Sequence, residues 1–267
     1  MCLRFLKVGL VAIILVLPSM ALPTLTVCAD PDNLPYSNRA REGYENRIAQ
    51  LLADNLHRKL IYRWARMDRG FVREFLNRGG CDVLIQVPTA FAPVLATKPF
   101  YESTYVFVVR QSRKLKISSF DDPILRHLKI GVQMMGDDYA TPGIALTRRG
   151  LAQNIVGFRS SGDESQEIIQ AVSSGRIDLA IVWGPLAGYY ARSAARKLRL
   201  VPVPAFDSPG LPFRYKLSMA VRKGNDSLKR ELDAFLASQK SAIDRILRSY
   251  AVPTIDIHRD PQVAGGL

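Results

Sequence analysis

Residues that build catalytic and metal sites are scarce in this sequence. Its 267 residues include three histidines, His57, His127 and His258, and none has a second metal ligand three or four residues later, so zinc is not supported. Residues 30–33 lack the glycine and the ligand spacing of an EF-hand and are expected to form a turn. No G-x-S-x-G, H-E-x-x-H, P-loop or dinucleotide-binding motif occurs. We therefore expect no metal, no cofactor and no catalytic residues.

Long apolar runs are absent after the first 21 residues. Residues 8–17 are apolar, follow Arg4 and Lys7, and precede Pro18 and the small residues up to Ala21. This pattern predicts a Sec signal peptide over residues 1–21. No later stretch is long enough to span a membrane. The mature protein is expected to be periplasmic, without stable membrane insertion.

Acidic residues are fewer than basic ones. The chain has 37 Lys and Arg against 24 Asp and Glu, a formal charge of +13, and loss of Arg4 and Lys7 with the leader reduces it to +11. This balance favours an acidic partner, although a generally basic protein remains an alternative. Nucleic acid is not expected, because the basic residues are spread along the chain in ones and twos and the protein is exported.

Two cysteines, Cys28 and Cys81, remain after removal of the leader. An oxidising compartment permits a disulfide between them. The alternative is that both are small buried residues. The sequence leaves this choice open.

Apolar periodicity predicts two successive units of alternating strands and helices. In the first unit we expect strands over 25–29, 60–64 and 82–87 and helices over 43–56 and 70–77. In the second we expect strands over 129–132, 155–158, 177–182 and 198–202 and helices over 121–127, 141–149, 164–174 and 185–195. Two helices near the C-terminus follow, the first capped by Asn225 or Asp226.

Two further strands, over 101–110 and 215–222, are expected to cross between the units. The predicted fold is α/β with two lobes, each a mainly parallel sheet flanked by helices. Lobe 1 is predicted over residues 22–107 and 216–256, lobe 2 over 108–215, and a loose tail over 257–267.

Several phrases resemble those of the type II periplasmic substrate-binding proteins across almost the whole mature chain. They are Ser173-Ser174-Gly175-Arg176-Ile177-Asp178-Leu179-Ala180-Ile181-Val182, Tyr189-Tyr190-Ala191 and Lys129-Ile130-Gly131-Val132-Gln133. The resemblance implies a two-lobed binding fold with a ligand cleft between the lobes.

A more specific resemblance rests on a combination of short sequence motifs. They are Val27-Cys28-Ala29-Asp30-Pro31-Asp32-Asn33-Leu34-Pro35-Tyr36-Ser37-Asn38, Arg69-Gly70-Phe71-Val72-Arg73, Gly80-Cys81-Asp82-Val83, Val87-Pro88 and Ser103-Thr104-Tyr105-Val106-Phe107-Val108. Together they resemble the MoxJ and XoxJ group, binding-protein homologues associated with quinoprotein methanol dehydrogenases. This implies an accessory role toward a pyrroloquinoline-quinone alcohol dehydrogenase or its cytochrome c.

The groups that hold a free amino acid in the superfamily are missing here. An arginine after the third strand grips the ligand carboxylate in amino-acid-binding members, but residues 88–93 contain none. The acidic residue after the last cleft strand is replaced by Trp183-Gly184-Pro185. Free amino acids are therefore not expected as ligands.

The predicted cleft is apolar and aromatic with a few polar points, which suits a hydrophobic protein segment or a small apolar ligand. Its expected residues are Asp30, Asn33, Tyr36, Thr89, Phe91, Tyr101, Gln133, Met134, Asp137, Trp183 and Tyr189. Phe71, on the inward face of its helix, is expected in the core.

Two other functions stay open. One is a solute receptor of an ABC transporter for a small apolar or aromatic molecule. The other is a cleft enzyme with Asp30 and Asp137 as paired carboxylates.

Overall fold

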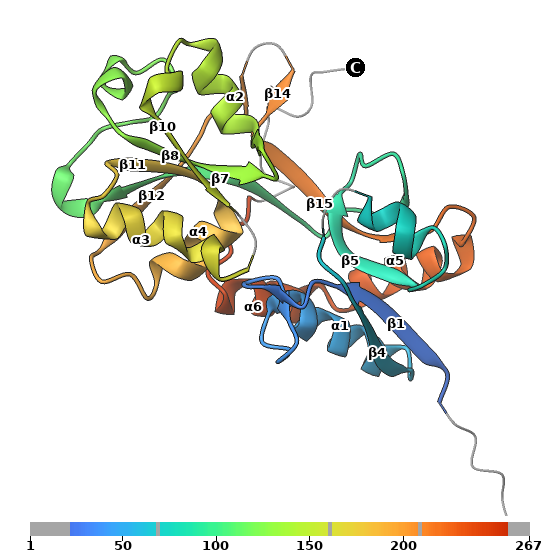
Figure 1. Cartoon of the computed structure of the whole chain (residues 1–267). Helices are drawn as coiled ribbons and strands as arrows, with labels where there is room; N and C mark the ends of the chain where they lie inside the picture. The colour runs from blue at the N-terminus through green and yellow to red at the C-terminus, as the bar shows by residue number, and fades with distance from the viewer. Residues whose placement is uncertain (1–21, 68–69, 160–161, 208–209, 256–267) are drawn as a thin grey trace, which may run out of the picture.

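The computed structural model describes residues 22–67, 70–159, 162–207 and 210–255. The predicted signal peptide and C-terminal tail lie outside these residues. Two α/β bodies lie side by side, joined by strands β7 (Tyr101–Arg110) and β15 (Arg214–Val221) (Figure 1). None of the described helices is both long and apolar enough to cross a membrane.

Lobe 1 is built on parallel strands β1 (Thr24–Ala29), β4 (Lys59–Trp64) and β5 (Val83–Pro88). The sheet runs in the order β4-β1-β5-β15, and β15 lies antiparallel to β5. The predicted strands are confirmed. The remaining elements are β2 (Asp32–Asn33), β3 (Ser37–Asn38), β6 (Leu95–Ala96), α1 (Tyr44–Asn55), α5 (Asp226–Ser238) and α6 (Lys240–Ser249).

The helix expected over 70–77 is a single π-helical turn, η1 (Val72–Leu76). The predicted start of α5 is confirmed, because the Asn225 side chain accepts a hydrogen bond from the Leu228 amide at 3.4 Å. At the start of α1 the Gly43 amide donates to Oδ1 of Asn46 at 3.1 Å. These caps satisfy amides that the first helical turn leaves without an intrahelical partner.

Lobe 2 is built on parallel strands β8 (Ile130–Met135), β10 (Ile155–Arg159) and β11 (Leu179–Trp183). The helix expected over 121–127 is a 3₁₀ turn instead. The helix expected over 164–174 begins as a 3₁₀ turn up to Gln166 and is α-helical only from Glu167. The remaining strands are β9 (Asp138–Tyr139), β12 (Leu198–Pro202), β13 (Phe206–Asp207) and β14 (Leu211–Pro212). The helices are α2 (Thr141–Arg148), α3 (Glu167–Ser174) and α4 (Gly184–Ala191).

Strand β7 belongs to both lobes. Its residues Tyr101 to Thr104 pair with β15. Residues 105–109 pair with β11 on one side, and residues 106–110 pair with β12 on the other. The change of partner at Thr104 and Tyr105 falls slightly before the lobe boundary expected after residue 107, and that boundary stays a prediction.

Successive side chains of β7 point to opposite faces of the sheet and so enter the two cores of lobe 2 in turn. Phe107 and Val109 pack into a core with Leu125, while Val106 and Val108 pack into the core on the other face. All four β7 side chains are at most 1% exposed. This burial on both faces explains why the segment reads as a continuous apolar run.

The core of lobe 1 also lies on both faces of its sheet. The larger part lies under α1, where Tyr44, Ile48 and Leu52 are fully buried. The smaller part contains Phe71, as expected, and a disulfide between Cys28 and Cys81, whose Cα atoms are 5.5 Å apart. The disulfide ties β1 to the segment that enters β5.

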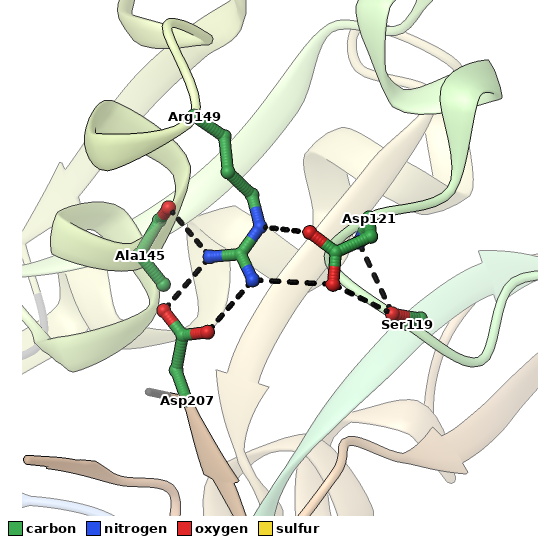
Figure 2. Close-up of polar contacts among 5 residues, drawn as sticks. All are labelled: Ser119, Asp121, Ala145, Arg149 and Asp207. Atoms are coloured by element: carbon green, nitrogen blue, oxygen red, sulfur yellow. Dashed lines mark hydrogen bonds and ion pairs between the residues drawn. The ribbon is translucent and has the colours of Figure 1, made fainter. Parts of the chain in front are cut away.

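Arg149 ties three segments of lobe 2 together (Figure 2). Its guanidinium donates to both oxygens of Asp207, at 2.7 and 2.8 Å, and to Asp121 through Nε at 2.7 Å. A further bond reaches the Ala145 carbonyl at 3.1 Å. The planar fork of arginine holds two carboxylates at once, which fixes β13 and the turn at Asp121 against the end of α2.

Replacing Arg149 by Lys should lower the free energy of unfolding by about 2 kcal/mol, because an ammonium group cannot make paired bonds to both carboxylates. Urea unfolding at pH 7 measures this change. Arg126→Lys, at an exposed arginine, is the control. Equal urea midpoints for the two variants would show that the contacts of Arg149 contribute no stability.

Candidate functional site

Aromatic side chains from both lobes meet where the crossing strands change partners. We call this set the interlobe aromatic cluster: Tyr36, Tyr44, Tyr101, Tyr105, Trp183, Tyr190 and Tyr215. Tyr101 and Tyr105 lie on β7, Tyr215 on β15, and Trp183 at the end of β11. The cluster therefore lies at the carboxyl end of β11 and where β7 changes partner, and the carboxyl ends of strands are where open α/β sheets bind ligands.

Hydrogen bonds fix the lobe 1 side of the cluster. The Tyr44 hydroxyl lies 3.1 Å from that of Tyr101 and donates to Oε1 of Gln86 at 2.7 Å. The Tyr101 hydroxyl also bonds to Oε1 of Gln86. The ring of Tyr36 packs edge-on against Tyr44, with centroids 5.6 Å apart.

Trp183 anchors the lobe 2 side. Its ring lies edge-on to Tyr105 at 5.3 Å and to Tyr215 at 5.7 Å, and it also contacts the core of lobe 1. Its backbone amide donates to Oε1 of Gln133 at 2.7 Å. The indole thus lies where both crossing strands and both lobes meet.

Direct contacts join the lobes around the cluster. The Tyr190 hydroxyl donates to the Leu34 carbonyl at 3.1 Å and lies 3.2 Å from the Ser165 hydroxyl. Helix α4 approaches lobe 1 so closely that a Cβ atom at Gly184 would lie 2.6 Å from the Thr104 carbonyl oxygen. A glycine is required at this point of contact.

A buried acid lies beside the phenols. Glu45, in the first turn of α1, is 7% exposed, and within the described residues its carboxyl group forms no ion pair. Burial, together with the negative charge of Asp30, raises the pKa of Glu45 to about 8. Burial also raises the pKa values of Tyr36, Tyr101 and Tyr105 above the usual range for tyrosine. The junction therefore favours neutral groups at physiological pH.

Three of the polar residues predicted in the cleft are engaged by the protein's own chain. The Asp30 carboxylate accepts bonds from the amides of Asp32 at 3.0 Å and Met67 at 2.9 Å. The Thr89 hydroxyl lies 2.8 Å from that of Ser218, and Gln133 holds Trp183. These side chains position the strand ends. The bonds of Asp30 also occupy the carboxylate on which the paired-carboxylate alternative depends.

Of the other predicted residues, three belong to the interlobe aromatic cluster and five lie outside it. Tyr36, Tyr101 and Trp183 are brought together, as described above. Phe91 is 36% exposed after β5, Asp137 is exposed in the turn between β8 and β9, and Met134 packs against Gly157 of β10. Asn33 is partly buried in β2, and Tyr189 stacks on Tyr250, with centroids 5.9 Å apart.

Tyr189 lines an open groove of about 700 Å³ at the outer seam between the lobes. Helices α1 and α6 of lobe 1 and helix α4 of lobe 2 form its walls. Its residues are Glu42, Arg47, Gln50, Leu51, Asp54, Tyr189, Arg192, Ile246, Ser249 and Tyr250.

Sequence reasoning missed Glu45, Tyr105, Tyr190 and Tyr215. A signal for Glu45 was present, because it shares a helical face with Ile48, Ala49 and Leu52 at spacings of three, four and seven residues. An acidic residue on the buried face of a helix marks a candidate site. The tyrosines, two on strands and Tyr190 on α4, carried no comparable signal, since tyrosines in such elements are equally common in cores.

Among the described residues, no group of three His, Cys, Asp or Glu side chains is arranged to hold a metal ion. No family model matches the chain. MoxJ of Methylorubrum extorquens is 32% identical over 255 residues, which cover 88% of this chain and 82% of that protein. MoxJ of Paracoccus denitrificans is 29% identical over 271 residues, covering 92% and 95%.

This chain belongs to the MoxJ family. The crystal structure of the periplasmic binding protein XoxJ from Methylobacterium extorquens AM1 is 33% identical with a TM-score of 0.72 and covers 87% of this chain and 100% of that one. MxaJ from Methlophaga aminisulfidivorans MPT is 26% identical with a TM-score of 0.78 over the same shares. The predicted family and the two-lobed binding-protein fold are confirmed.

Replacing Glu45 by Gln should change how stability depends on pH. Between pH 4.5 and 8 the folded protein keeps a proton on Glu45 that the unfolded chain releases, so the free energy of unfolding falls as pH rises through this range. The side-chain amide of the variant stays neutral at every pH. Above pH 8 the free energy of unfolding of the variant should therefore exceed that of the parent by roughly 5 kcal/mol.

Urea unfolding from pH 4 to 9 measures this difference. Glu164→Gln, at an exposed glutamate, is the control and should leave the slope unchanged. If the Glu45 variant followed the parent across the whole range, the carboxyl would not be held in its neutral form.

Proposed function

We propose that this MoxJ-family protein is a periplasmic accessory factor of a quinoprotein methanol or alcohol dehydrogenase system. It binds the dehydrogenase or its cytochrome c and catalyses no reaction itself. The family membership supports this assignment, as does the XoxJ structure, which is that of a periplasmic binding protein. The predicted signal peptide is part of the same proposal.

The observation that carries the proposal is that the protein's own aromatic side chains occupy the lobe junction. Trp183 contacts both crossing strands, and Tyr190 bonds to lobe 1. No arginine lies in residues 88–93 to grip a carboxylate, and Gly184 and Pro185 follow Trp183 where an ammonium-binding acid would be expected. These features favour contact with a protein over capture of an amino acid.

Within this proposal, Tyr36, Tyr101 and Trp183 form the apolar surface that an inserted segment or apolar ligand would meet on opening of the lobes. Asp30, Thr89 and Gln133 hold that surface in shape. The other residues predicted in the cleft, Asn33, Phe91, Met134, Asp137 and Tyr189, would contact only a larger partner.

The mature protein should co-elute with the quinoprotein dehydrogenase of its source organism, or with the cytochrome c of that enzyme, on a sizing column. Binding should weaken from low to moderate salt, because the chain carries excess positive charge. The dehydrogenase is tested in apo and cofactor-loaded form. Absence of a complex with every form at both salt concentrations would overturn the proposal.

The solute-receptor alternative makes a different prediction, because an apolar ligand closed between the lobes stabilises the folded state by mass action. A melting-temperature increase with a small aromatic compound, together with no dehydrogenase complex, would favour that alternative. The interlobe aromatic cluster is the observation that supports the solute-receptor alternative.

A further inference from the structure

The free edge of lobe 1 differs from the free edge of lobe 2. Among the described residues, strand β4 ends the sheet on one side and pairs with β1 alone, whereas β10 ends it on the other side and pairs with β8 alone (Figure 1). Such an edge leaves backbone amides and carbonyls available to another chain. The difference between the two edges lies in their charged side chains.

Arginines beside β10 face carboxylates of their own lobe. Arg159 lies 3.9 Å from Glu164, and Arg176 lies 3.9 Å from Glu167. Both arginines are therefore already compensated, and the edge carries both signs of charge.

Arginines beside β4 also lie on aromatic rings, as Arg176 lies on the ring of Phe158 beside β10. The guanidinium of Arg39 is 5.9 Å from the Trp64 ring centroid, and that of Arg41 is 5.3 Å from the Tyr62 centroid. The two rings stack on each other at 4.5 Å. Within the described part of the chain, neither arginine forms an ion pair. A guanidinium held over a ring still points its in-plane N–H donors outward, toward an incoming carboxylate.

The turn that carries both arginines is fixed in place. The Arg39 amide donates to the Pro31 carbonyl and the Arg41 amide to the Asn38 carbonyl, both at 2.9 Å. The nearby Glu42 carboxylate is occupied by the Asn38 side-chain amide at 2.8 Å. These bonds fix the backbone of the turn, and the ring contacts hold the two guanidinium groups beside β4.

The opposite face of β4 is partly apolar. Ile61 and Arg63 alternate with Tyr62 and Trp64, so they point to the other side of the strand. Ile61 is 41% exposed, and the Arg63 guanidinium lies 5.3 Å from the centroid of Phe75. An added strand would therefore meet cationic groups on one face and apolar surface beside Arg63 on the other.

We propose that the β4 edge, flanked by Arg39 and Arg41, binds an extended acidic segment of a partner protein as an additional strand. Backbone bonds to β4 supply affinity, and acidic side chains at alternate positions of the segment bind the two arginines. The proposal assigns a docking surface to the accessory role above, but its test uses a peptide and does not depend on that role.

The probe is an eight-residue peptide of alternating Glu and Val, and the control peptide replaces Glu by Lys. The Glu peptide should slow hydrogen exchange of amides in residues 59–64 and change Trp64 fluorescence, while the Lys peptide should do neither. Arg39→Gln with Arg41→Gln should weaken binding at least tenfold. Arg126→Gln with Arg230→Gln removes the same charge from exposed positions elsewhere and should have little effect.

No protection of β4 by the Glu peptide, or equal loss of affinity in the two double variants, would overturn the docking proposal. The same variants are then tested with the dehydrogenase and its cytochrome c. A dehydrogenase complex that both variants retain would leave the accessory role standing and place its contact elsewhere. Protection by the peptide without any dehydrogenase complex would keep the edge site and reject the accessory role.

Discussion

Strand β7 is the constraint on which the rest of the molecule depends. Its backbone groups are satisfied by β15 of lobe 1 up to Thr104 and by β11 and β12 of lobe 2 from Tyr105 onward. Buried backbone groups must stay paired, so any bending between the lobes is expected near this change of partner. Tyr101, Tyr105 and Trp183 lie near that point. The residues of the lobe junction are therefore also the residues around the change of partner.

Neutral groups are concentrated at the junction, and uncompensated charge lies on the surface. Burial raises the pKa of Glu45 and of the phenols beside it, so introducing an ion there would carry a desolvation cost. Arg39 and Arg41, by contrast, keep their charge at the rim of lobe 1. An acidic partner is thus expected to be attracted to this outer face rather than to the junction, where burial penalises a charged group.

Periodicity along the sequence predicts most strands and helices, because each buried face repeats within a few residues. It does not predict the roles of Asp30 and Gln133, since their partners are backbone amides set by chain packing, such as that of Met67. The disulfide stayed open for the same reason: its geometry depends on how Cys81, just before β5, approaches Cys28 on β1. The sequence shows which residues stand at strand ends, but their bonding partners depend on the three-dimensional packing of the chain.

The contacts outside the cluster bear on how the protein binds. Helix α4 of lobe 2 packs on lobe 1 with Gly188 against the Ala251 carbonyl, and Tyr190 bonds to Leu34 beyond it. Entry of a ligand into the junction requires both contacts to break before any new contact forms. Binding through an outer edge requires neither. For a chain without the clamps of an amino-acid receptor, an outer edge can meet a partner while these contacts between the lobes stay in place.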